Sequence, residues 1–132
     1  MLLRGSHFSQ VLEMDTGITY VLPDNTRIQG PYRTVYLLPG LCGNTGCWVD
    51  NSLLHIYAQE YHAVFILPEV ARSFYADMVR GQKFFTYLTE ELPARVKDIF
   101  QVSERREHTT IIGGSMGGYG ALKCALTKPE LY

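Results

Sequence analysis

Two stretches of the chain consist almost entirely of apolar residues, which is typical of strands buried on both faces. They are residues 34–38, Thr-Val-Tyr-Leu-Leu, and residues 63–67, Ala-Val-Phe-Ile-Leu. Residues 109–112 are β-branched throughout and predict a third buried strand. Apolar residues at helical spacing predict a helix over 84–100, in which Pro93 is expected to cause a kink.

The other predicted elements fill the spaces before, between and after these strands. In chain order they are strands 8–14 and 17–23 around the turn Asp15-Thr16-Gly17, a helix over 48–60, a loop over 69–82 and a helix over 118–126. Alternation of buried strands with helices predicts an α/β fold, with a mostly parallel sheet and helices on both faces. Residues 1–132 are expected to form a single domain.

Composition and charge exclude several classes of function. A net charge of −1 gives no electrostatic reason to bind nucleic acid or an anionic membrane, and no apolar run has the length of a membrane span. The first seven residues lack the apolar core of a signal peptide. Three cysteines without Cys-x-x-Cys spacing predict free thiols in a reducing cytoplasm and no zinc site, with a Cys42–Cys47 bridge as the alternative.

The strongest chemical signal is the sequence Gly113-Gly114-Ser115-Met116-Gly117, which has the pattern Gly-x-Ser-x-Gly. It lies between a predicted strand and a predicted helix, the context of a nucleophile elbow. A serine at the tip of so tight a turn is expected to have a strained backbone with positive φ. The following helix would direct its positive N-terminal end at the serine, where negative charge develops during acyl transfer.

A glycine-rich stretch of this kind has two other interpretations. A strand-to-helix turn without chemistry would need the same glycines, so the pattern alone does not decide between them. Nucleotide binding does not fit, because no Gly-x-Gly-x-x-Gly register exists and no lysine follows the last glycine as in a phosphate loop.

A second glycine-rich loop, residues 39–44, follows the predicted strand 34–38. In a parallel sheet this loop and the serine lie at the same edge, where open α/β sheets bind their ligands. The backbone N–H groups of Leu41 and Met116 are therefore expected to form an oxyanion hole. Gly40 would allow close approach of a substrate, and Trp48 and Tyr75 would line its acyl pocket, with simple packing as the alternative for both aromatic residues.

Four segments resemble the esterase D branch of the α/β hydrolases, which includes S-formylglutathione hydrolases and bacterial tributyrin esterases. They are residues 36–44 with Trp48, residues 72–78, residues 85–93 and residues 114–121. The resemblance implies that Ser115 is the nucleophile, that Leu41 and Met116 form the oxyanion hole, and that the loop 73–75 lies beside the cleft. Pro39 departs from the family, which usually has histidine at this position.

The histidine and carboxylate that would activate the serine are not found in the expected order. On this fold they follow the serine, but the residues after Ser115 include no histidine and only Glu130 as an acid. The resemblance implies a family member about twice as long, truncated here after the elbow helix. The histidines that precede Ser115 are interpreted as surface or structural residues: His7, His55, His62 and His108.

The sequence thus predicts the N-terminal portion of a serine carboxylesterase or thioesterase that acts on short-chain acyl esters through an acyl-serine intermediate. No metal or organic cofactor is implied, and the 132 residues alone are expected to be inactive. The alternatives are a non-catalytic binding module and an acyltransferase on the same site. A homo-oligomer, or pairing with another chain through the exposed edge of strand 109–112, is also expected.

Overall fold

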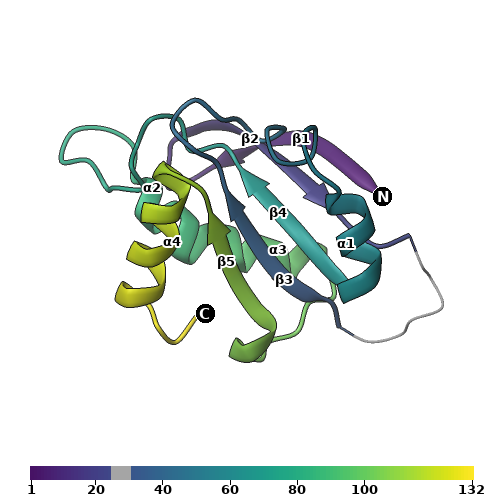
Figure 1. The fold of residues 1–132 in the computed structure, drawn as a ribbon. Helices are drawn as coiled ribbons and strands as arrows, with labels where there is room; N and C mark the ends of the chain where they lie inside the picture. Colours follow the sequence, from purple (N-terminus) through teal and green to yellow (C-terminus); the bar gives the residue numbers. More distant parts are fainter. Residues whose placement is uncertain (25–30) are drawn as a thin grey trace.

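Five strands form one mixed sheet in the computed structural model, which describes residues 1–24 and 31–132 (Figure 1). Their order across the sheet is β1-β2-β4-β3-β5. The strands are β1 (Leu2–Ser9), β2 (Met14–Val21), β3 (Arg33–Leu38), β4 (Ala63–Pro68) and β5 (Thr109–Gly113). The three strands expected from the sequence are β3, β4 and β5, and all three exist. β3 and β4 are largely buried, as predicted, whereas β5 is only partly buried, because it lies at an edge of the described sheet.

The pairing of β3 with its neighbours brings the two glycine-rich loops together. β3 runs parallel to both β4 and β5, whereas β2 runs antiparallel to β4 and to β1. In the β3–β5 register Leu38 is opposite Gly113. The loop that follows Leu38 and the turn that follows Gly113 therefore start side by side at the carboxyl edge of the sheet.

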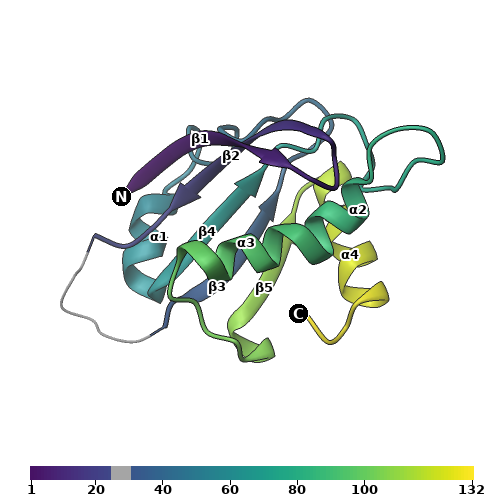
Figure 2. The same ribbon diagram turned by 180° about the vertical axis from the view of Figure 1, so that it is seen from behind.

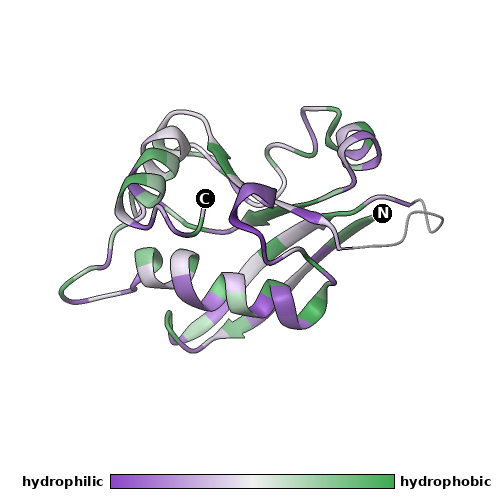
Figure 3. Cartoon of the chain, turned by 90° about the horizontal axis from the view of Figure 1, so that it is seen from below, coloured by the Kyte–Doolittle hydropathy of each residue, from purple (hydrophilic) through white to green (hydrophobic). Residues whose placement is uncertain are grey.

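Helices cover both faces of the sheet, as predicted (Figures 2 and 3). The helical segments are α1 (Leu54–Tyr61), α2 (Phe84–Thr86), the π-helical turn η1 (Tyr87–Glu91), α3 (Leu92–Ile99), the 3₁₀ turn η2 (Arg106–His108) and α4 (Met116–Thr127). On one face Leu37 and Phe65 pack with α1. On the other face Tyr36 and Ile66 pack with α3 and α4. Successive strand residues point to opposite faces, so one sheet supplies both cores.

The N-terminal hairpin exists, but its turn is not where the sequence predicts it. Asp15-Thr16-Gly17 lies inside β2, and the turn spans residues 10–13, with Glu13 at φ 55°. The carboxylate of Glu91 accepts hydrogen bonds from the backbone N–H groups of Gln10 and Val11. The partner that fixes this turn is therefore some 80 residues away in sequence.

The helices predicted over residues 48–60 and 84–100 both exist, but each differs from its prediction in detail. The helix expected over 48–60 starts only at Leu54, because Asn51 and Ser52 donate side-chain hydrogen bonds to the carbonyls of Cys47 and Trp48 and hold a turn there. The helix expected over 84–100 is continuous to Ile99 but is π-helical over Tyr87–Glu91, which ends two residues before Pro93. Proline has no N–H and crowds the preceding turn, which accounts for the disturbance there.

β5 is an edge strand of the described sheet, and apolar surface flanks it. Ile112 is 44% exposed, and on α4 Leu122 and Leu126 are 66% and 80% exposed. Figure 3 shows α4 as white and green over most of its length. On the other face a groove of about 600 Å³ runs between α1 and β5, lined by Leu54, Tyr57 and Ile112 among others.

Candidate active site

Ser115 occupies a strained turn at the start of α4. Its backbone has φ 56° and ψ −122°, and the residue is exposed. The predicted positive φ is confirmed, and so are the strand before the serine and the helix after it. A Cβ built on Gly113 would lie 2.2 Å from the backbone of Gly117. The turn is therefore too tight for any other residue at position 113.

The loop after β3 lies against this turn. A Cβ built on Gly40 would be 3.6 Å from Cβ of Ser115 and 3.5 Å from the carbonyl oxygen of Gly114. Leu41, the next residue, is partly buried, and Met116 is buried at the first position of α4. Gly40, Leu41, Ser115 and Met116 are thus neighbours, although the direction of the two N–H groups toward one oxyanion stays a prediction.

Two aromatic side chains bind successive carbonyls where β3 passes into this loop. The indole N–H of Trp48 donates to the carbonyl of Leu38 at 3.1 Å. The hydroxyl of Tyr75 donates to the carbonyl of Pro39 at 2.7 Å. Tyr75 has no exposed surface, which differs from the expectation that its ring lines a substrate pocket. Trp48 is partly buried and borders the groove beside α1.

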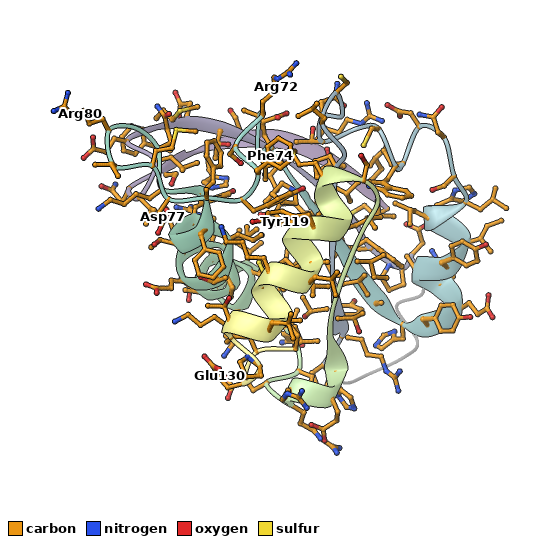
Figure 4. All side chains as sticks on the ribbon, turned by 60° about the vertical axis from the view of Figure 1, so that its left-hand side comes forward. Arg72, Phe74, Asp77, Arg80, Tyr119 and Glu130 are labelled. Carbon is orange, nitrogen blue, oxygen red and sulfur yellow. The ribbon has the colours of Figure 1, made fainter. Side chains whose placement is uncertain are left out.

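An aromatic pair lies beside α4, and only one of its members belongs to a segment that the family resemblance placed beside the cleft, namely Phe74 in the loop 73–75; Tyr119 was not predicted. Phe74 and Tyr119 are 49% and 52% exposed, and their rings meet edge to face with centroids 6.2 Å apart. Figure 4 shows both next to α4, with Arg72 and Arg80 farther out. Tyr119 follows Ser115 by one helical turn and so shares its side of the helix. The four-residue spacing between Ser115 and Tyr119 is the signal that could have predicted that Tyr119 lies near the serine.

The histidines are distributed over distant parts of the fold. His62 and His108 directly precede β4 and β5 and so lie at the amino edge, whereas Ser115 lies at the carboxyl edge. A five-residue strand separates these edges by roughly 16 Å. His7 lies on β1, at the opposite side of the sheet from β5, and stacks on Tyr87. His55 is exposed on the first turn of α1.

The described part of the chain, residues 1–24 and 31–132, contains neither a metal-binding cluster nor a membrane-spanning helix. No group of three histidine, cysteine or acidic side chains there is arranged to hold a metal ion. None of the helices described has both the length and the apolar character needed to cross a membrane. Cys42, Cys47 and Cys124 are free thiols.

A serine at positive φ between a strand and a helix, on a mixed sheet with helices on both faces, defines the α/β-hydrolase class. Within that class the chain belongs to the Esterase family ("Putative esterase"), whose model matches residues 9–132.

Curated relatives and solved structures agree with this assignment. The chain is 29% identical to an acetyl esterase of Caldicellulosiruptor saccharolyticus, over 95% of this chain and 50% of the relative. It is 30% identical to S-formylglutathione hydrolase of Bos taurus, over 78% of this chain and 44% of the relative. The structure of the fluorophosphonate-binding serine hydrolase F of Staphylococcus aureus matches all of this chain and 54% of its own, with 30% identity and a TM-score of 0.91. The chain therefore spans about half the length of these proteins.

Proposed function

We propose that this chain carries the nucleophile and the oxyanion hole of a serine hydrolase for short-chain acyl esters or thioesters. The observation that carries the proposal is the backbone of Ser115, at φ 56° on the first turn of α4, with Gly40 in contact beside it. A strained serine in this setting is typical of the nucleophile of α/β hydrolases. The ester hydrolases among its relatives support the choice of reaction.

In the proposed reaction the oxygen of Ser115 attacks the acyl carbonyl and gives its proton to a general base. The N–H groups of Leu41 and Met116 stabilise the oxyanion, and the N-terminal dipole of α4 adds to this stabilisation. Collapse of the tetrahedral intermediate releases the protonated alcohol or thiol and leaves an acyl-serine. Water then attacks this acyl group, and the carboxylic acid leaves.

The general base is proposed to come from polypeptide outside these 132 residues. His62 and His108 lie at the far edge of the sheet and His7 on its far side, so none of the three is suitably placed. Serine without a base is a weak nucleophile at neutral pH. An enzyme that has lost members of its triad keeps only about 10³–10⁴-fold catalysis over water, from the oxyanion hole and binding.

The test compares the 132-residue chain with a chimera in which the chain is followed by the remaining half of the C. saccharolyticus acetyl esterase. Both are assayed with p-nitrophenyl acetate and butyrate, each beside its Ser115→Ala variant. The chain alone is expected to show no turnover that depends on Ser115, and the chimera is expected to show it. A chimera that unfolds cooperatively but lacks such turnover would contradict the proposal. Robust Ser115-dependent turnover by the chain alone would place the base among its own histidines.

We further propose that the isolated chain associates with a second copy through the free edge of β5. An edge strand with β-branched residues and apolar flanks pairs readily with another strand. The three free thiols support a reducing compartment, and hence the cytoplasm, as its location.

A further inference from the structure

A buried hydrogen bond connects Tyr75 to the loop that carries Leu41. The Tyr75 hydroxyl donates to the carbonyl of Pro39 at 2.7 Å, and the side chain has no exposed surface. Burial raises the pKa of the Tyr75 phenol, so the hydroxyl keeps its proton and remains a donor at neutral pH. A hydrogen bond shielded from water is also stronger than an exposed one.

The position of this carbonyl explains why the bond matters for the oxyanion hole. The carbonyl of Pro39 and the nitrogen of Gly40 belong to one planar peptide group. The Leu41 N–H shares the next peptide group with the Gly40 carbonyl, which accepts the N–H of Gly43 at 3.0 Å and so closes a turn inside the loop. Because glycine rotates freely at Gly40, the orientation of this turn relative to β3 and Ser115 depends on anchors outside the loop. The Tyr75 hydroxyl is such an anchor, since it fixes the peptide plane immediately before Gly40.

The same side chain also contacts the helix that begins at the nucleophile. A Cβ built on Gly120 of α4 would lie only 2.4 Å from Cδ2 of Tyr75, so the ring lies directly on the helix backbone. Lys123, also on α4, donates to the carbonyl of Tyr75 at 2.9 Å. Tyr75 therefore touches the element that positions Ser115 and the loop that positions Leu41.

The backbone that presents Tyr75 is strained. Phe74 and Tyr75 have φ values of 48° and 54°, a region that bulky side chains rarely occupy. The hydroxyl oxygen of Ser73 accepts the N–H of Tyr75 at 3.1 Å and helps to hold this conformation. Strain of this kind persists where the surrounding structure enforces it, and it is concentrated at functional sites.

We infer that Tyr75 is a positioning residue, whose buried hydroxyl fixes the carbonyl of Pro39 and thereby aims the N–H of Leu41 at the oxyanion beside Ser115. This inference rests on the proposed function, because the aim of that N–H matters only if acyl transfer occurs at Ser115. Tyr75 itself does not touch the substrate.

The test replaces Tyr75 by phenylalanine, which removes the hydroxyl and keeps the ring on Gly120. Tyr87→Phe is the matched control, because Tyr87 is equally buried but its hydroxyl lies 3.4 Å from Nε2 of His7, away from the site. The first measurement is amide hydrogen exchange in the 132-residue chain. In Tyr75→Phe the amides of residues 40–43 are expected to exchange about fivefold faster, the effect of losing one hydrogen bond, while those of β4 keep their rates. Tyr87→Phe is expected to leave the loop unchanged.

The second measurement uses the chimera described above. An interaction made chiefly in the transition state affects kcat rather than KM. Tyr75→Phe is expected to lower kcat about tenfold or more with KM within about twofold, and Tyr87→Phe to change neither. The inference would be overturned if the amides of residues 40–43 exchanged at equal rates in the two variants, or if the Tyr75→Phe chimera had an unchanged kcat. A chimera without turnover would count against the proposed function, and the exchange rates would still decide whether Tyr75 anchors the loop.

Discussion

The backbone of Gly117 packs directly against the carbonyl of Leu38. A Cβ built on Gly117 would lie 2.3 Å from that oxygen and 2.9 Å from the carbonyl oxygen of Pro39. Both oxygens belong to the backbone and cannot rotate away. The first turn of α4 thus approaches the end of β3 more closely than a side chain would allow, and this approach brings the elbow and the glycine-rich loop into contact.

Gly117→Ala is therefore expected to destabilise the fold by about 1–3 kcal/mol, because overpacking forces the helix and β3 apart. Urea unfolding followed by circular dichroism would measure the change in the free energy of unfolding. Gly5→Ala is the control, since a Cβ there meets nothing within 4 Å. It is expected to stay within about 0.5 kcal/mol of the unmodified chain. Equal stability of the two variants would contradict the close approach.

Glu91 makes the stability of the hairpin turn dependent on pH. Burial raises the pKa of this carboxyl group, but hydrogen bonds from Ser9, Val11 and Gln10 outweigh it and hold the pKa below its ordinary value of 4.5. The folded state therefore binds this proton less readily than the unfolded state. The resulting stabilisation is complete above pH 4.5 and is lost as the pH falls through the lowered value.

Glu91→Gln is expected to cost about 1–2 kcal/mol at pH 7 and to flatten the decline in stability below pH 4.5. Chemical unfolding at a series of pH values between 3 and 7 (roughly the range over which carboxyl groups titrate) would reveal both effects. Glu90→Gln is the matched control, because Glu90 is largely exposed and lies 3.8 Å from Lys128. An acid decline of unchanged steepness in Glu91→Gln would rule out this role.

We expect a substitution at Ile112 to reduce the self-association of the chain. Ile112 is exposed on the edge strand β5 and borders the groove beside α1. Ile112→Lys places a charge on this edge, a change that opposes pairing between strands. Sedimentation velocity is expected to show a larger monomer fraction for this variant. Phe8→Lys makes a similar change on β1 at the opposite edge, where Phe8 is 50% exposed. An equal effect of both substitutions would mean that β5 is not the preferred contact.

The sequence predicted those features whose causes are local. The strands β3 and β4 were predictable because continuous apolar runs need burial on both faces, and the positive φ of Ser115 was predictable from the glycines at 113 and 117. Family resemblance agreed with both.

The features that were missed depend on contacts between distant residues. The hairpin turn depends on Glu91, which follows it by some 80 residues. The burial of Tyr75 depends on the missing side chain of Gly120 and on the position of Pro39, 36 residues earlier. A tyrosine in a loop without periodicity offered no local sign that it would fold inward. The start of α1 was misjudged because the side chains of Asn51 and Ser52 compete with the helix for backbone carbonyls.

The edge position of β5 makes the placement of Ser115, the proposed nucleophile, depend on what binds to that edge. β5 pairs with β3 through residues distant in sequence, such as Thr34 and Thr109, and the rest of the sheet keeps its pairing if β5 detaches. Local opening of β5 would remove Ser115 from the loop of Leu41 without unfolding the other four strands. A polypeptide that binds only the docked form of β5 shifts this equilibrium by mass action. Such binding would extend the sheet and, in the same event, hold Ser115, the proposed nucleophile, against the loop of Leu41.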